Sequence, residues 1–207
     1  MRMNTMTKTM TRVKNFRGAI LLVIFGTSLA GCAASVPNPT FPELTFGHLG
    51  QINLNVASLE IVSSYKSPMA APNVEHKFPS SPEKALMRWA SDRLRATGSS
   101  ARASFTILNA SVRETTLEKQ KGIKGAFTKD QSERYDAVLE ASLKITDDDT
   151  NSEGFANAKA SRSITVREDA TLNERAQAWF ELNEALMQDI NAALEKNISQ
   201  YLGNWLN

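Results

Sequence analysis

Three oxygen-bearing side chains in the second half of the chain have the spacing of a calcium-binding loop. Asp147, Asp149 and Asn151 stand at alternate positions, as the first three ligands of such a loop do. The same loop requires a glycine where Ser152 stands and a bidentate glutamate where Ala158 stands. We therefore interpret this stretch as a solvated hairpin turn and predict no metal site.

Other residue types that commonly carry catalysis are sparse. The two histidines, His48 and His76, stand far apart with no carboxylate or thiol at metal-ligand spacing. The sequence contains no Gly-x-Ser-x-Gly motif and no phosphate-binding loop. Asp92 and Arg93 are interpreted as part of a solvated helix face. We predict no catalytic residue and no cofactor, and a hydrolase without a legible site stays an alternative.

The stretch from Glu118 to Lys129 combines positive charge with apolar residues. Its four lysines are interleaved with two glycines and two large apolar residues. We predict a basic loop whose lysines contact lipid phosphates or an acidic protein face, while its apolar tips reach acyl chains. The alternative is a solvated connection between two strands. The candidate contact residues are Lys119, Lys121, Ile123, Lys124, Phe127 and Lys129.

The N-terminal 31 residues have the pattern of an export signal. Five basic residues and no acidic residue precede an apolar run from Gly18 to Ala30. This run is too short to cross a hydrocarbon core of ~30 Å, which needs about 20 apolar residues. We therefore predict a cleaved targeting segment and not a transmembrane helix. Cys32 follows it and is the only cysteine, so no intramolecular disulfide can form.

The residues before that cysteine resemble the lipobox of bacterial lipoproteins. Leu29, Ala30 and Gly31 precede Cys32. The resemblance implies cleavage before Cys32, a diacylglyceryl group on its thiol and an acyl group on the new N-terminus, which together form a stable anchor. In such lipoproteins an aspartate after the cysteine commonly marks inner-membrane retention, and Ala33 stands there instead. We expect the inner leaflet of the outer membrane, with the protein facing the periplasm. The alternative is an ordinary signal peptide followed by a free or paired cysteine.

Cleavage would change the charge of the chain. The 207-residue precursor has 24 basic and 22 acidic residues and a net charge of +2. Residues 1–31 hold five of the basic residues and none of the acidic ones, so a mature chain of 176 residues carries a net charge of −3. A mildly acidic exported chain argues against a nucleic-acid partner. Its length suffices for one domain with a real core.

We divide the chain into a signal peptide over residues 1–31, a lipidated cysteine with a Pro-rich tether over 32–50, and one periplasmic α+β domain over 51–207. Three prolines without hydrophobic periodicity predict an extended tether that holds the domain away from the bilayer. Four apolar residues in its distal part are candidates to dock on the domain: Phe41, Leu44, Phe46 and Leu49.

Hydrophobic periodicity predicts the elements of this domain. A first strand with a bulge near Ala57 is expected over residues 52–61. A helix follows over residues 82–97, with Ser81 as its N-cap and Gly98 as its stop. Three further strands are predicted over residues 103–117, 134–146 and 155–167, with a hairpin loop over 147–154.

The last element is predicted to be a long helix. Thr171 and Glu174 form a Thr-x-x-Glu capping box, and apolar residues recur behind it at helical spacing. The resulting helix of about 35 residues, roughly 50 Å, would outreach the sheet. Its far end should therefore either kink near Gly203 or expose apolar surface around Tyr201 and Trp205.

The predicted order is β-α-β-β-β-α. This is an α+β fold with a four-stranded, mainly antiparallel sheet, two helices on one face and a long C-terminal helix. From Tyr135 to Asp148, an alternating strand led by tyrosine ends in acidic residues, and a hairpin, a strand and the long helix follow. In this order the chain resembles the small domains of lipopolysaccharide-assembly lipoproteins and of the auxiliary lipoproteins of envelope ABC transporters.

The resemblance implies a membrane-anchored, non-enzymatic accessory component of an outer-membrane assembly or lipid-transport machine. The expected partners are the membrane through the lipid anchor, an envelope protein and, as a candidate, anionic lipid. A periplasmic activator that docks on a cell-wall synthase is the second function left open.

Overall fold

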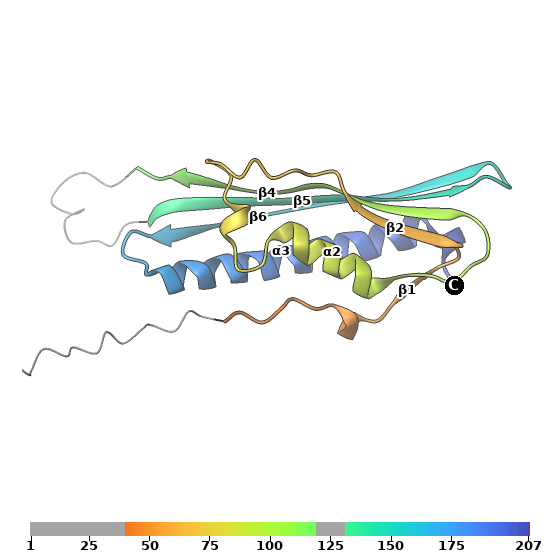
Figure 1. Ribbon diagram of the computed structural model, residues 1–207, viewed down its shortest axis with the longest axis horizontal. Coiled ribbons are helices and arrows are strands. Elements are labelled where there is room, and N and C mark those ends of the chain that lie inside the picture. The colour runs from red at the N-terminus through yellow and green to blue at the C-terminus, as the bar shows by residue number, and fades with distance from the viewer. Residues whose placement is uncertain (1–39, 119–130) are drawn as a thin grey trace, which may run out of the picture. The chain divides into compact units, whose positions relative to one another are not determined.

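The structure, a computed structural model, describes residues 40–118 and 131–207. Its centre is a four-stranded sheet of β2 (Ser58–Ser63), β4 (Arg102–Thr116), β5 (Gln131–Asp147) and β6 (Ser152–Arg167), in this order across the sheet. β2 runs parallel to β4, and the other neighbours are antiparallel. Figure 1 shows α2 (Pro82–Arg93) and α3 (Leu172–Tyr201) together on one face of the sheet. The predicted α+β fold is confirmed.

The core lies between the sheet and the two helices. Alternate side chains of β5 point into it, and each of them is at most 1% exposed. These are Tyr135, Ala137, Leu139, Ala141, Leu143 and Ile145. Leu86 and Trp89 of α2 and Leu186, Ile190 and Leu194 of α3 are buried opposite them. Period two in the strand and period 3.6 in the helices thus bury their apolar sides in one layer.

The first strand differs from the prediction. Residues 52–61 do not form one bulged strand, because β1 (Ile52–Leu54) pairs with β3 (Leu94–Ala96) in a separate two-stranded parallel sheet. Immediately after β1, the N–H of Asn55 donates to the carbonyl oxygen of Trp205 at 2.7 Å. This hydrogen bond to the C-terminal segment therefore helps to turn the chain at the point where a bulge was predicted. Of the two strands, only β2 joins the main sheet.

Helix α2 is shorter than predicted. It ends at Arg93, because the next three residues pair with β1 and the N–H of Gly98 donates to the carbonyl oxygen of Val56. Gly98 is needed for space and not as a helix stop, since a Cβ there would lie 2.5 Å from the carbonyl carbon of Asn55. Ser81 caps the helix as predicted, and its hydroxyl accepts the N–H of Lys84 at 3.3 Å.

The three long strands match their predicted positions within a few residues at each end. The connection between β5 and β6 is tighter than predicted and covers residues 148–151. In β4 the register with β5 shifts between Ile107 and Asn109, and Leu108 is 45% exposed. This bulge returns Ala110 and Val112 to the buried face.

Helix α3 begins with the predicted capping box. The N–H of Glu174 donates to the Thr171 hydroxyl at 3.2 Å, and the Thr171 N–H donates to the Glu174 carboxylate at 2.7 Å. The helix ends at Tyr201, and the short helix η4 (Gly203–Trp205) turns the chain back onto the core. Leu202 is fully buried, so the chain bends near Gly203 as predicted. Tyr201 nevertheless stays 57% exposed, whereas Trp205 packs against the core, so the second predicted outcome occurs in part. Among the described helices, none is long and apolar enough to cross a membrane.

The connection from β2 to α2 is held against the edge of β4. Glu75 in the short helix η3 (Glu75–Lys77) is 2% exposed, and its carboxylate accepts the hydroxyl of Tyr65 at 2.6 Å and the N–H of Val112 at 3.1 Å. The N–H of Val74 donates to the carbonyl oxygen of Val112 at 2.9 Å. These bonds cover an edge that β2 is too short to pair.

Candidate functional site

The residues that the sequence singled out for anchoring and for contact lie outside the described part of the chain. They are Cys32, Lys119, Lys121, Ile123, Lys124, Phe127 and Lys129. The described residues stop at Glu118 and resume at Gln131, the first residue of β5. Their roles therefore stay predictions.

The acidic stretch after β5 forms the predicted hairpin turn. Asp147 uses both carboxylate oxygens within the turn, accepting the N–H of Asp149 at 3.1 Å and the hydroxyl of Thr150 at 2.8 Å. The Thr150 hydroxyl holds the pKa of Asp147 below its ordinary value. Asn151 takes the left-handed φ of 52° that tight turns favour. In the described ranges, no group of three or more His, Cys, Asp or Glu side chains is placed to hold a metal ion.

The segment before β1 lies along the helical layer, and we call residues 40–50 the strap. Its Phe41 stacks on Phe180 of α3, with ring centroids 5.3 Å apart. Its Phe46 is 8% exposed, and the Phe46 N–H donates to Oδ2 of Asp92 on α2 at 2.9 Å. Figure 1 shows the strap, in orange, beside the helices on the side away from the sheet. The distal part of the predicted tether therefore packs on the domain.

The other two docking candidates differ from each other. Leu44 packs against the core, whereas Leu49 is 42% exposed. The short helix η2 (Gly47–Leu49) lies near the C-terminal end of the strap. In it, the N–H of Leu49 donates to the carbonyl oxygen of Phe46 at 3.0 Å.

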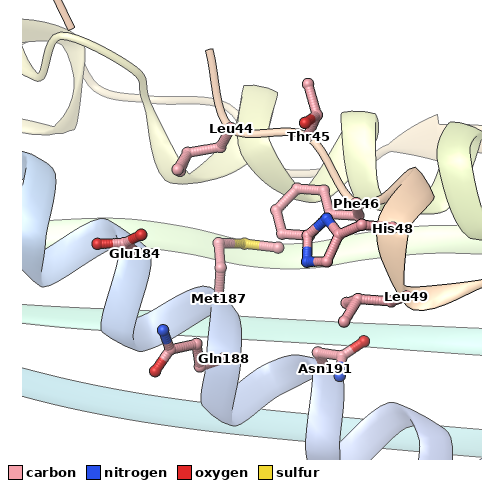
Figure 2. A pocket seen from close by; sticks show the side chains of 9 residues that line it. All are labelled: Leu44, Thr45, Phe46, His48, Leu49, Glu184, Met187, Gln188 and Asn191. Carbon is pink, nitrogen blue, oxygen red and sulfur yellow. The ribbon is translucent and has the colours of Figure 1, made fainter. Parts of the chain in front are cut away.

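A groove of about 300 Å³ lies between the strap and α3, and Figure 2 shows its lining. The apolar lining consists of Leu44, Phe46, Leu49 and Met187, and the polar lining consists of Thr45, His48, Glu184, Gln188 and Asn191. Small-ligand sites have mostly apolar walls with a few polar groups, so the lining of this groove is more polar than is typical of them, and its volume lies at the lower end of their range. This groove is a candidate site, and it brings one of the two histidines, His48, to its wall.

Asn191 connects the groove to a polar cluster between α2 and α3. Its Oδ1 accepts the indole N–H of Trp89 at 2.7 Å and Nη1 of Arg93 at 2.9 Å. Arg93 is 4% exposed, its Nη2 donates to Oε1 of Glu195 at 2.6 Å, and its guanidinium lies 5.9 Å from the centroid of the Trp89 ring. A buried guanidinium needs such partners, so the cluster fixes the two helices against each other.

Arg93 corrects the sequence interpretation. It was placed on a solvated helix face with Asp92, but it is one of the few buried charged residues among those described. The sequence did contain one indication that Arg93 is buried. Arg93 follows Trp89 by four positions, which puts both side chains on one helix face. Asn191 and Glu195 have the same spacing on α3, yet nothing in the sequence indicated that the two pairs meet.

Asp92 links the strap to α2. Burial opposes ionisation of its carboxyl group, but the N–H of Phe46 and the guanidinium of Arg88 outweigh burial and hold the pKa of Asp92 below its ordinary value. Nε of Arg88 lies 2.8 Å from Oδ1 of Asp92, and Nη1 of Arg88 lies 3.4 Å from Oε1 of Glu43 in the strap. The pair with Glu43 is solvent-exposed and contributes little to stability.

The strap is held by few contacts for its length. In the described structure, two polar contacts join the strap to the helices, one at Phe46 and one at Glu43. The remaining contacts are the stack of Phe41 on Phe180 and the packing of Leu44 and Phe46 against the core.

A second polar network, partly buried, lies where β4 ends and β5 begins. The Tyr135 hydroxyl accepts Nη1 of Arg175 at 2.5 Å and donates to Oε1 of Glu114 at 3.3 Å. Arg175 also donates to Glu133 at 2.6 Å, and Trp179 packs edge-on against Tyr135. Burial raises the pKa of Tyr135 to about 12, so its phenol stays neutral. The network joins α3 to the sheet, and its role is structural.

Comparison with known proteins identifies no family. No protein-family model matches the chain, and no curated protein matches it. Among solved structures, the chain is similar to protein XCC0632 from Xanthomonas campestris, described as DUF330, with a TM-score of 0.32, 10% identity and coverage of 80% of this chain and 91% of that one. It is also similar to a PelC dodecamer from Paraburkholderia phytofirmans, with a TM-score of 0.20, 10% identity and coverage of 66% and 89%. With TM-scores this low, neither likeness says what this chain does.

Proposed function

We propose that the protein is a lipid-anchored envelope protein, held by a modified Cys32, that serves as a non-enzymatic accessory component of an outer-membrane assembly or lipid-transport machine. The observation that carries the proposal is the packing of the strap. Phe41, nine positions after Cys32, already stacks on Phe180. Nine fully extended residues span at most ~30 Å. The strap would therefore hold the domain close to any membrane that takes lipid chains on Cys32.

An anchor this short favours partners at the same membrane. A short linker turns binding into an intramolecular event with an effective concentration in the millimolar range. Weak contacts then suffice, which suits an accessory component with small binding surfaces. Ala33 after Cys32 directs the proposal to the periplasm-facing leaflet of the outer membrane.

Two surfaces are proposed for contact. One is the groove between the strap and α3, which combines apolar walls with polar groups. The other is the basic loop, whose lysines would attract anionic lipid or an acidic protein face by about 1 kcal/mol for each basic residue near an anionic surface. Both surfaces bind and position a partner, and neither is assigned a reaction.

Affinity purification of the tagged full chain in mild detergent tests this function. The wild type is expected to recover components of an outer-membrane assembly or transport machine. Cys32→Ser is expected to fold normally, as circular dichroism would report, yet to lose these components because it no longer resides at the membrane. Recovery of a cell-wall synthase instead would favour the activator alternative. Hydrolysis of an envelope substrate by the purified chain, without any stable partner, would favour the hydrolase alternative.

A further inference from the structure

The strap is flanked by open space on both sides. The groove of about 300 Å³ separates its C-terminal half from α3. A second cavity of about 250 Å³ lies between residues 41–44 and the start of α2, where Lys84 and Arg88 line it. The strap contacts the domain through the side chains of Phe41, Leu44 and Phe46.

The core of the domain is nearly complete without the strap. In the described residues, Phe46 is the one buried core side chain that the strap supplies. The first residue of the domain with a sheet partner is Ile52, which pairs with Leu94. Removing the strap would leave both sheets and their hydrogen bonds in place.

The strap ends at a glycine two residues before β1. Gly50 has a φ of 79° and a ψ of 171°, a conformation that residues with a Cβ rarely adopt. A Cβ at this position would meet no atom within 4 Å, so the requirement for glycine comes from the backbone angle and not from crowding. A change of backbone angles at Gly50 can swing the strap while Ile52 stays in its sheet.

Release of the strap would change the reach of the anchor. From Cys32 to Phe41 the chain spans at most ~30 Å, but from Cys32 to Ile52 it spans up to ~70 Å when extended. We propose that the strap detaches from the helical layer as a unit, hinging at Gly50, and so switches the anchored domain between a short and a long reach. The switch of reach rests on the proposed lipid anchor, whereas the detachment of the strap does not.

Hydrogen exchange of the full-length protein tests the detachment. The amide of Phe46 donates to Asp92 of α2 in the attached state, so it reports contact between the strap and the helices. It is expected to exchange at least about 100-fold faster than the amide of Leu139 in β5, because local opening needs less free energy than global unfolding. Equal protection of strap and β5 amides would overturn the proposal, since the strap would then open only with the whole domain.

Two variants sharpen this test. Phe46→Ala removes the buried anchor and is expected to raise the opening of the strap by about ten- to a hundredfold while Leu139 keeps its protection. Leu49 lies in the same segment but its side chain is 42% exposed. Leu49→Ala is therefore expected to change neither the opening of the strap nor the protection of Leu139. If Phe46→Ala accelerates exchange in β5 as much as in the strap, or fails to fold, the strap is part of the core and does not detach.

The change of reach is tested on lipid vesicles. A Phe41→Cys/Phe180→Cys variant, crosslinked between these two positions, keeps the strap attached. A fluorophore is attached after Asn207, and energy transfer to labelled lipid headgroups measures its distance from the membrane. We expect this distance to be shorter, and its distribution narrower, in the crosslinked protein than in the same protein without the crosslink. Identical transfer with and without the crosslink, in protein shown to carry lipid, would overturn the switch. Absence of lipid on Cys32 would refute the proposed anchor and leave the exchange result to decide on detachment.

Discussion

The rings of Phe41 and Phe180 stack with their centroids 5.3 Å apart and an angle of 27° between their planes. This contact ties a residue close behind Cys32 to the first half of α3. It therefore decides where the N-terminal segment leaves the domain. The C-terminus is tied at a different place, since the N–H of Asn207 donates to the carbonyl oxygen of Asn53 at 3.1 Å and Leu206 bridges to Leu54.

Replacing the buried carboxylate of Glu75 should destabilise the domain. Glu75→Gln loses charge-assisted bonds from Tyr65 and from the N–H of Val112, and we expect a loss of about 1–3 kcal/mol in the free energy of unfolding. Urea denaturation measures the change. Glu60→Gln on the exposed side of β2 is the matched control and should leave the midpoint unchanged. Equal midpoints for both variants would show that Glu75 does not hold the connection to β4.

The contribution of Glu75 should depend on pH. Burial opposes its ionisation, but hydrogen bonds from Ser67, Tyr65 and the Val112 N–H outweigh burial and lower its pKa below the ordinary value of 4.5. The folded state thus favours the ionised form, so the contribution is fully present above pH 4.5 and is lost as the pH falls below it. The stability difference between the wild type and Glu75→Gln should narrow in that range. A difference that is constant from pH 7 to pH 3 would contradict the assigned pKa direction.

Removing Glu195 should cost more unfolding free energy than removing Arg93, the residue with which it pairs. Glu195→Ala leaves a buried guanidinium without its counter-charge, and we expect a loss of about 2–3 kcal/mol. Arg93→Met leaves Glu195, which is 44% exposed and can be rehydrated, so a loss of about 1 kcal/mol is expected. Asp189→Ala removes an exposed pair with Arg162 and should cost less than about 1 kcal/mol. The opposite order of the first two variants would show that Arg93 is not the group that needs its partner.

Removing the N-cap of α3 should weaken the domain by a predictable amount. Thr171→Ala loses the side-chain half of the capping box, and we expect a loss of about 1 kcal/mol by chemical denaturation. Ser199→Ala on the exposed face of the same helix is the control, since it removes a hydroxyl without a capping role. Thr171→Ala with wild-type stability would place the start of the helix elsewhere.

Elements that depend on local contacts were predictable from the sequence, and elements that depend on distant contacts were not. β5 and the capping box of Thr171 and Glu174 were predictable, because alternation and capping are local patterns. The split between β1 and β2 was not, since it depends on the distant carbonyl oxygen of Trp205. The early end of α2 was not predictable either, because the three residues after Arg93 pair with the distant strand β1.

The candidate site was predictable only in part. The apolar residues of the strap indicated docking, and Phe41, Leu44 and Phe46 do pack on the domain. The groove itself arises between two segments more than a hundred residues apart, such as His48 and Gln188, and no local pattern reports such a meeting. The buried position of Arg93 likewise depends on Asn191 and Glu195 from another helix.

Reversing the charge of the basic loop should remove the proposed contact without unfolding the protein. The variant replaces Lys119, Lys121, Lys124 and Lys129 by Glu. We expect loss of binding to anionic vesicles at low salt, because each lysine near the surface contributes roughly 1 kcal/mol, whereas the unfolding midpoint should not change. Vesicle flotation over a salt series measures the binding.

A control with the same change of charge isolates the loop. It replaces four exposed lysines elsewhere on the domain by Glu: Lys66, Lys77, Lys84 and Lys196. This control should bind anionic vesicles more tightly than the loop variant at equal ionic strength. Equal binding of the two variants would mean that net charge, and not the loop, governs attraction, and the loop would then be only a solvated connection.

Labelling of cells with a clickable fatty acid tests the central claim, that Cys32 carries the membrane anchor. The wild type should incorporate the label and fractionate with the outer membrane, because its thiol is the attachment atom and Ala33 follows it. Cys32→Ser should incorporate none and should accumulate uncleaved or leave the membrane fraction. Labelling of Cys32→Ser at the wild-type level, or an unlabelled wild type, would show that Cys32 does not carry a lipid anchor.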